Sequence, residues 1–300
     1  MTTDNRMHQN QPKETVLLAG ATGYLGNYIA QELIRRNIPV KIIARRPEKI
    51  EHLKGENREI IRAEVTQPET LEGLCNEVTT VISTVGITRQ KDGLTYMDVD
   101  YQANLNLLNE AKKAGVKKFI YVSAINGDKY RQLKIFQAKE AFVDALKNSG
   151  LDYTVMRPNG FFSDMHDFLD MAKGGRVYLF GDGHFQMNPI HGEDLAQVCV
   201  DAIFSDAKEI AIGGPDNLSQ NELASLALKA WNKPIKIAHL PDWIRRLTIS
   251  LVRTFTSSKT YGPIEFFLTL MANDQLAPNY GKHHLEDFFN QEAETMKKKK

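Results

Sequence analysis

The stretch "VLLAGATGYLGNYIA", residues 16–30, decides the fold. A short apolar run typical of a buried strand leads into Gly20, Gly23 and Gly26, and a helical pattern follows. Glycines at this spacing permit a tight turn, and the helix N-terminus offers free N–H groups and the positive end of its dipole. The stretch predicts a strand–loop–helix unit that binds the diphosphate of a dinucleotide. The alternative is a glycine-rich turn without a ligand.

Apolar runs rich in Val and Ile alternate with helical patterns beyond this unit. The runs lie at 15–18, 40–44, 59–65, 80–84, 118–123 and 153–157. The helical patterns lie near 24–36, 97–114 and 135–149. Buried parallel strands joined by crossover helices have this signature. We therefore expect an α/β, doubly wound parallel-sheet Rossmann fold over residues 15–160.

The alternation becomes irregular after residue 160. We expect a smaller, mainly helical C-terminal lobe over 161–290, which covers the substrate side, while elements near 190–213 return to the main sheet. Residues 1–14 are polar and are expected to form a disordered lead-in. Residues 291–300 are expected to form a polar tail.

Composition excludes several classes of function. Lys+Arg is 38 and Asp+Glu is 37 in 300 residues, so no basic excess favours nucleic acid. Cys75 and Cys199 are the only cysteines, and no Cys/His cluster has zinc spacing, so no metal site is predicted. The lead-in lacks the apolar region of a signal peptide, and no run of about 18 apolar residues exists. A reducing, cytoplasmic location is expected.

The end of the second predicted strand bears on the choice of cofactor. Arg45 and Arg46 follow "VKIIA", where an NAD site usually carries an acid for the ribose 2′-hydroxyl. An arginine there pairs instead with the 2′-phosphate, which predicts NADP(H), with Arg45 as the first choice. Two solvated arginines are the alternative interpretation. Glu64 and Val65, at the end of the third strand, are expected to border the adenine.

Six motifs then point to a family. They are "GATGYLG", "ARRPEK", "VISTVG", "GVKKFIYVSA", the lysine of "FQAKEAF" and "YTVMRPNGFFSDM", in this order over residues 15 to 165. With them the chain resembles an atypical short-chain dehydrogenase/reductase of the NmrA-like and isoflavone-reductase-like branch. The later "LAPNYGKHHLEDFF" looks like the tail of divinyl chlorophyllide reductases.

The resemblance assigns roles to individual residues. It implies cofactor contacts for Gly20, Thr22, Gly23, Tyr24, Leu25, Gly26 and Arg45. It implies that Val85 and Gly86 line the dinucleotide groove. Pro158, Asn159 and Gly160 would border the nicotinamide. Ser123 takes the position of the family's catalytic serine, and Lys139 that of its lysine, which binds the ribose.

One position departs from the family. Ile135 stands where many relatives carry a tyrosine, so the proton donor is open. Lys139 is one candidate, because its pKa should fall beside an oxidised nicotinamide. Tyr130, in the loop "NGDKYRQ", is expected to be flexible and is a second candidate. The remaining alternatives are Tyr121, His184 and His191.

These patterns favour an NADPH-dependent reductase of a small hydrophobic molecule, acting on a C=C or C=O bond. The alternative is a non-catalytic NADP(H)-binding protein, either a redox-responsive regulator or an assembly factor. The apolar helical segment 242–274 is interpreted as part of the lobe, with weak contact to a membrane surface as the alternative.

Overall fold

A seven-stranded parallel sheet forms the centre of the molecule in a computed structural model, which describes residues 14–87 and 93–298. Its strand order is β3-β2-β1-β4-β5-β6-β9. The first three strands are added toward one edge of the sheet and the later strands toward the other, so the strand order reverses between β1 and β4. The strands are β1 (Val16–Ala19), β2 (Val40–Ala44), β3 (Arg58–Arg62), β4 (Thr80–Ser83), β5 (Lys118–Val122), β6 (Asp152–Pro158) and β9 (Glu209–Ile212). This is the expected Rossmann topology. The predicted lead-in lies outside the described residues except for Glu14.

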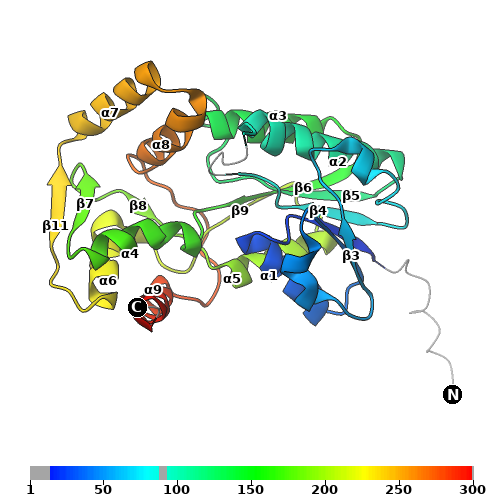
Figure 1. The fold of residues 1–300 in the computed structure, drawn as a ribbon, viewed down its shortest axis with the longest axis horizontal. Coiled ribbons are helices and arrows are strands. Elements are labelled where there is room, and N and C mark those ends of the chain that lie inside the picture. Colours follow the sequence, from blue (N-terminus) through cyan, green and yellow to red (C-terminus); the bar gives the residue numbers. More distant parts are fainter. Residues whose placement is uncertain (1–13, 88–92, 299–300) are drawn as a thin grey trace.

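Helices cover both faces of the sheet (Figure 1). One face carries α1 (Tyr24–Arg35) and α5 (Gly192–Asp201), and the other carries α2 (Asn104–Lys113) and α3 (Lys134–Lys147). A π-helical turn, Met97–Ala103, leads into α2. Short 3-10 turns occupy Pro47–Leu53, Pro68–Leu71, Phe162–Met165 and Ala202–Phe204.

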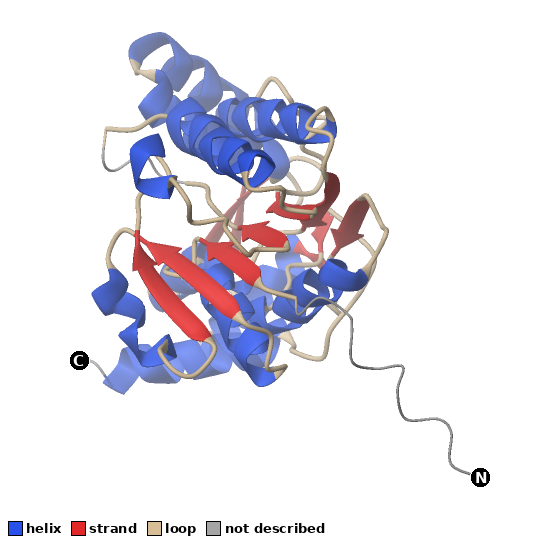
Figure 2. Cartoon of the chain, turned by 90° about the vertical axis from the view of Figure 1, so that its right-hand side faces the viewer, coloured by secondary structure: helices blue, strands red, loops and turns tan. Residues whose placement is uncertain are grey.

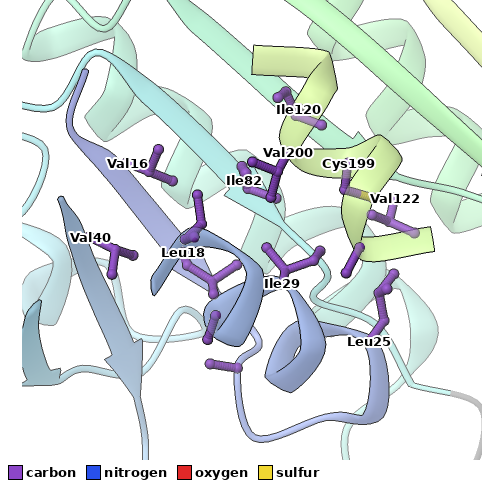
Figure 3. Close-up of a cluster of buried hydrophobic side chains, with 14 of the residues drawn as sticks. Val16, Leu18, Leu25, Ile29, Val40, Ile82, Ile120, Val122, Cys199 and Val200 are labelled. Atoms are coloured by element: carbon purple, nitrogen blue, oxygen red, sulfur yellow. The ribbon is translucent and has the colours of Figure 1, made fainter. Parts of the chain in front are cut away.

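Alternate residues of the strands enter two separate cores. Leu18 and Ile82 pack with Ile29 of α1 and Val200 of α5 (Figure 3). Leu17, whose side chain points to the opposite face, packs under α2 and α3. Because both faces are buried, the strands consist of continuous apolar runs, and for this reason their positions are readable from the sequence.

The C-terminal lobe has a core of its own. It consists of α4 (His166–Lys173), α6 (Gln220–Ala230), α9 (Leu285–Lys298) and two small sheets. The sheets pair β7 (Val177–Phe180) with β11 (Ile237–Leu240), and β8 (Gln186–Met187) with β10 (Leu218–Ser219). Residues 291–298 of the predicted polar tail are helical, because α9 continues to Lys298. Phe289 and Ala293 are buried one turn apart, and α9 packs on α6 through this face.

Two further helices form a hairpin at the outer edge of the molecule (Figures 1 and 2). They are α7 (Asp242–Phe255) and α8 (Ser258–Leu270), and α8 packs between α7 and α3. The expected helical segment 242–274 is therefore present as two helices. Among the described residues, no helix combines the length and the apolar character needed to cross a membrane.

Residues 275–284, here called the linker, lead from α8 back across the ends of the main strands. Gln275 N–H donates to Gln186 O at 2.7 Å, and Tyr280 N–H donates to Gly213 O at 2.9 Å. Gly213 directly follows β9, which pairs with β6 in the main sheet. The helix before β9, α5, packs on α1. The segment near 190–213 therefore belongs to the main sheet, and the linker fastens the lobe to it.

Candidate functional site

The glycine loop has the geometry of a phosphate cradle. Gly20 has a φ of +96°, which side-chain-bearing residues rarely adopt. A Cβ at Gly26 would lie 2.2 Å from Gly20 O, so the helix can pack this closely on the loop only with glycine there. Gly23 is the N-cap of α1 and makes no side-chain cap hydrogen bond. Thr22 and Gly23 are exposed, so the helix N-terminus faces solvent with room for a diphosphate.

The two residues after Gly23 are tied into the protein. Leu25 is buried in the core beneath the loop. The Tyr24 hydroxyl accepts a hydrogen bond from Gly192 N–H at 3.0 Å, and its ring packs edge-on against Tyr28. Burial raises the pKa of Tyr24, with Gly192 acting in the opposite direction. Tyr24 therefore joins the loop to α5, and contact with a ligand through its side chain stays a prediction.

The adenine end of the predicted site lies at the ends of β2 and β3. Arg45 and Arg46 are both exposed there. Arg45 Nη1 lies 3.6 Å from Glu64 Oε1, and Glu64 also accepts from Thr66 Oγ1 at 3.0 Å. Val65 is partly buried, and its carbonyl accepts from Asn106 Nδ2. The structure thus places the four predicted residues at one edge of the sheet, with the arginines accessible.

We expect Arg45→Ala to remove most of a preference for NADPH over NADH. A charge-assisted contact with the 2′-phosphate contributes roughly 1.5–3 kcal/mol, or about one to two decades in affinity. Fluorescence titration with both cofactors measures the ratio, and Arg46→Ala serves as the neighbouring control. Equal affinities for the two cofactors in the parent protein would rule the assignment out.

A network of hydrogen bonds from the π-helical turn and the start of α2 fixes the loop after β4. Ser83 Oγ donates to Asn104 Oδ1 at 2.6 Å, and Asn104 Nδ2 donates to Val85 O at 3.1 Å. Ile87 N–H donates to Asp100 Oδ2 at 3.2 Å. Val85 and Gly86 are therefore fixed at the point where the strand order reverses, which is where open α/β sheets bind their ligands.

Lys139 lies under this loop and is not a surface lysine. Its Nζ is 3.0 Å from Oδ1 of Asp100, which is fully buried. A Cβ at Gly86 would lie 2.9 Å from the same Nζ. Burial lowers the pKa of Lys139, but Tyr121 and Asp100 outweigh it and raise the pKa overall. Burial raises the pKa of the Asp100 carboxyl and Lys139 opposes that shift, so the charged forms of Asp100 and Lys139 stabilise each other.

Ile135 and Tyr130 share an apolar cluster one turn before Lys139. They are buried with Tyr96, Leu133 and Phe136, and α8 closes the cluster through Phe266, whose ring centroid is 5.1 Å from that of Phe136. Tyr130 lies in a turn before α3, and its side chain is buried there. The Tyr130 hydroxyl is buried and makes no hydrogen bond to any described residue. A buried hydroxyl without a partner is costly and uncommon, so it marks Tyr130 for a role with a ligand.

Ser123 belongs to a buried charge cluster. Its hydroxyl donates to Glu140 Oε1 at 2.9 Å, and Arg157 donates to both Glu140 oxygens at 2.8 and 3.0 Å. Arg157 also pairs with Glu209 at 2.7 Å. Burial lowers the pKa of Arg157, yet the hydrogen bonds that Arg157 donates to Glu140 and Glu209 raise it overall. The hydroxyl of Ser123 is thus directed toward α3 in this structure.

We expect Glu140→Gln to destabilise the fold, because it leaves a buried guanidinium without its bidentate partner. Breaking a buried pair from one side costs roughly 3 kcal/mol or more, though Glu209 retains part of the compensation. Urea unfolding of parent and variant measures the loss. Asp144→Asn is the matched control, since Asp144 pairs with Arg131 in the same bidentate manner on the surface. That change should cost about 0–1 kcal/mol, and an equal cost for the two variants would contradict the argument.

The nicotinamide side of the predicted site ends in a cluster of amides. Asn159 follows Pro158 and donates through Nδ2 to Asn188 Oδ1 at 2.6 Å and to Gln275 O. Gly160 N–H donates to Asn159 Oδ1 at 2.7 Å. Asn126 donates to Gln275 Oε1 at 2.9 Å, while Gln275 Nε2 is buried and without a partner among the described residues. The linker thus contributes a free amide donor that the sequence did not indicate.

A group of histidines and acids lies beside the glycine loop, and the sequence had indicated only His191 among its members. Nδ1 of His283 lies 2.9 Å from the buried Asp194 Oδ1, and its ring lies 4.3 Å from that of His191. His191, Glu193 and His283 each place a potential metal-ligand atom within 4.8 Å of the others. Burial, together with His283, lowers the pKa of His191. Because His283 is distant in sequence, no spacing motif could reveal the group. His184 lies apart from it, exposed after β7.

The fold, the glycine cradle and the strand reversal define a nucleotide-binding protein, and comparison with known families agrees. The model of the NAD(P)H-binding family matches residues 20–206. The chain therefore belongs to that family, in agreement with the short-chain dehydrogenase/reductase motifs of its sequence. The expected nicotinamide cofactor is confirmed, and the glycine cradle fits its diphosphate.

Individual proteins with known names are similar to this chain over most of its length. The chain is 30% identical over 316 residues to the chloroplastic divinyl chlorophyllide a 8-vinyl-reductase of Zea mays, covering 92% of this chain and 78% of the relative. It is 26% identical over 245 residues to the photosystem II assembly factor Ycf39 of Synechocystis, covering 80% and 74%. The structure of an isoflavone reductase superposes with a TM-score of 0.71 at 17% identity, covering 93% of this chain and 99% of that one.

Proposed function

We propose that this chain is an NADPH-dependent reductase of a small hydrophobic molecule with a polarised C=C or C=O bond. The observation that carries the proposal is the largely enclosed ammonium of Lys139 beneath Gly86, at the strand reversal next to the glycine cradle. A charge in this position costs desolvation energy and is fixed by Asp100, as expected for a group that acts on a ligand. Buried, free Cys75 and Cys199 suit the reducing cytoplasm that we expected.

Different residues would bind the diphosphate and the 2′-phosphate of the cofactor. The loop of Gly20, Gly23 and Gly26 would hold the diphosphate, and Arg45 would hold the 2′-phosphate. The cofactor supplies the hydride when it is bound. Reduction of C=C or C=O also consumes one proton, which must come from the protein or water.

Two groups are suited to the proton step. Lys139 presents an ammonium that Asp100 keeps charged, so it binds ribose hydroxyls and adds positive potential. In the ligand-free chain Asp100 opposes the fall in the Lys139 pKa that proton donation needs. The unpartnered hydroxyl of Tyr130 is the second source, and Ser123 is less accessible because it donates to Glu140.

The decisive experiment supplies NADPH with deuterium at the transferred position to the purified chain. Enones, quinones and divinyl tetrapyrroles are offered as substrates, since a similar protein is a vinyl reductase. We expect deuterium in the reduced product of one class. NADPH binding without transfer to any class would refute the reductase.

The second candidate is a non-catalytic NADP(H)-binding assembly factor or redox-responsive regulator. The packed cluster around Ile135 and Tyr130 favours this second function, because side chains rather than open space lie beside α3, the helix that carries Lys139. The similarity to an assembly factor adds to this. For this function, NADPH and NADP+ should bind with different affinities or change the affinity for a protein partner, and no substrate should turn over.

A further inference from the structure

The outer face of α7 is apolar and uncovered. Of its fourteen residues, all within the described part of the chain, none is buried. Trp243, Leu247, Leu251 and Phe255 follow one another at intervals of four, and so share one face of the helix. Their exposed fractions are 62%, 47%, 47% and 77%. Four large apolar side chains in one exposed row are unusual for a surface and mark a binding face.

The rest of the helix explains why this row faces outward. The opposite side of α7 packs on α8, where Arg245 donates to Leu268 O and is held by Asp242. Arg253 pairs with the buried Glu265 of α8. These contacts fix the rotation of α7 about its axis, so the apolar row cannot turn inward without breaking the Arg245–Leu268 hydrogen bond and the Arg253–Glu265 ion pair.

Charge distinguishes the partner. The hairpin 242–270 carries Arg245, Arg246, Arg253 and Lys259 against Asp242 and Glu265, a net charge of 4 − 2 = +2. Arg246 is exposed and flanks the apolar row. A surface helix with one apolar face, an aromatic residue at each end of that face and cationic flanks is the type that lies in a bilayer interface.

We infer that α7 docks the protein on the surface of an anionic lipid bilayer, with Trp243, Leu247, Leu251 and Phe255 entering the interface. The inference stands apart from the proposed reductase, because it rests only on the hairpin of α7 and α8. It has a consequence for that function nonetheless. The hairpin reaches the cluster around Ile135 through Phe266, so docking would bring the candidate site close to a store of hydrophobic molecules.

The test is co-sedimentation of the full chain with vesicles of phosphatidylcholine containing phosphatidylglycerol. Binding is expected to weaken with salt and to be weaker on vesicles of phosphatidylcholine alone. The double variant Leu247→Ser/Leu251→Ser should lower the partition coefficient by roughly thirtyfold, because each half-exposed leucine loses part of its transfer energy. Arg246→Gln should lower it by about fivefold on anionic vesicles only. The emission of Trp243 should shift to the blue on binding, with Trp243→Phe used to subtract Trp231.

Phe204→Ser is the matched control, because Phe204 is 66% exposed and lies beside β5, away from the hairpin. It should sediment like the parent, and all variants should keep the parent's melting temperature. Equal sedimentation of the double variant and the parent would overturn the inference. So would an absence of vesicle binding combined with self-association that the double variant abolishes, since a second copy of the chain would then cover the row.

Discussion

Lys139→Met is expected to lower the turnover of a confirmed substrate by about two to four decades, the usual contribution of a positioned acid or base. Methionine keeps much of the apolar stem and removes the charge. The affinity for NADPH should fall much less, because the diphosphate cradle and Arg45 are untouched. The measurement is single-turnover hydride transfer, with cofactor affinity from a separate titration.

The buried partner of Lys139 requires a control. Methionine leaves Asp100 without its counter-charge, and burial already raises the pKa of this carboxyl. Lys139→Met/Asp100→Asn removes the unpaired acid and should recover stability but not turnover. Recovery of the rate in the double variant would show that the loss came from Asp100. An undiminished rate in Lys139→Met would refute a catalytic role for the lysine.

The glycines of the loop should respond in opposite ways to the same substitution. In Gly26→Val the Cβ would lie 2.2 Å from Gly20 O, which is a severe steric clash. We therefore expect a loss of roughly 3 kcal/mol or more in the free energy of unfolding. A Cβ at Gly23 would lie 3.3 Å from Gly20 O, and its φ of −86° suits any residue. Gly23→Val should therefore fold, yet lose at least about two decades in NADPH affinity, because the side chain fills the space of the diphosphate.

Circular dichroism, thermal unfolding and cofactor titration together separate the two effects. Gly23→Ala is the graded control, with a smaller obstruction and an intermediate affinity. A folded Gly23→Val protein that binds NADPH normally would show that the loop is only a turn. A Gly26→Val protein of parental stability would contradict the packing of α1 on the loop.

The Rossmann half was predictable because its determinants are local. A buried strand such as β1 reads as a continuous apolar run, and the glycine spacing directly follows it. The partners of the site residues were not readable, because Asp100 and Glu140 look like ordinary charged residues of helices. Only the crossover of the chain brings Asp100 beneath Gly86.

The C-terminal lobe was less predictable for a similar reason. Its short strands pair across long loops, and Gln275 reaches Asn159 from far along the chain. The last helix, α9, runs into the predicted polar tail, and its signal in the sequence was only Leu285, Phe289 and Ala293 at a spacing of four. Replacing Ile135, which stands at the family's tyrosine position, by tyrosine would also not simply supply the missing proton donor. Ile135 is packed among Tyr96, Tyr130 and Phe136, so the larger ring would cost roughly 1–3 kcal/mol.

The linker sets an order of assembly during synthesis. Residues 275–284 leave the ribosome after every strand of the main sheet, and the nascent Rossmann half can collapse around its own two cores before they appear. Until then, water rather than Gln275 and Ala277 accepts the hydrogen bonds of the Asn159 and Asn188 side-chain amides. We therefore expect the glycine loop to form before the linker closes the nicotinamide side, so that NADPH bound at that stage would stabilise the partly folded chain.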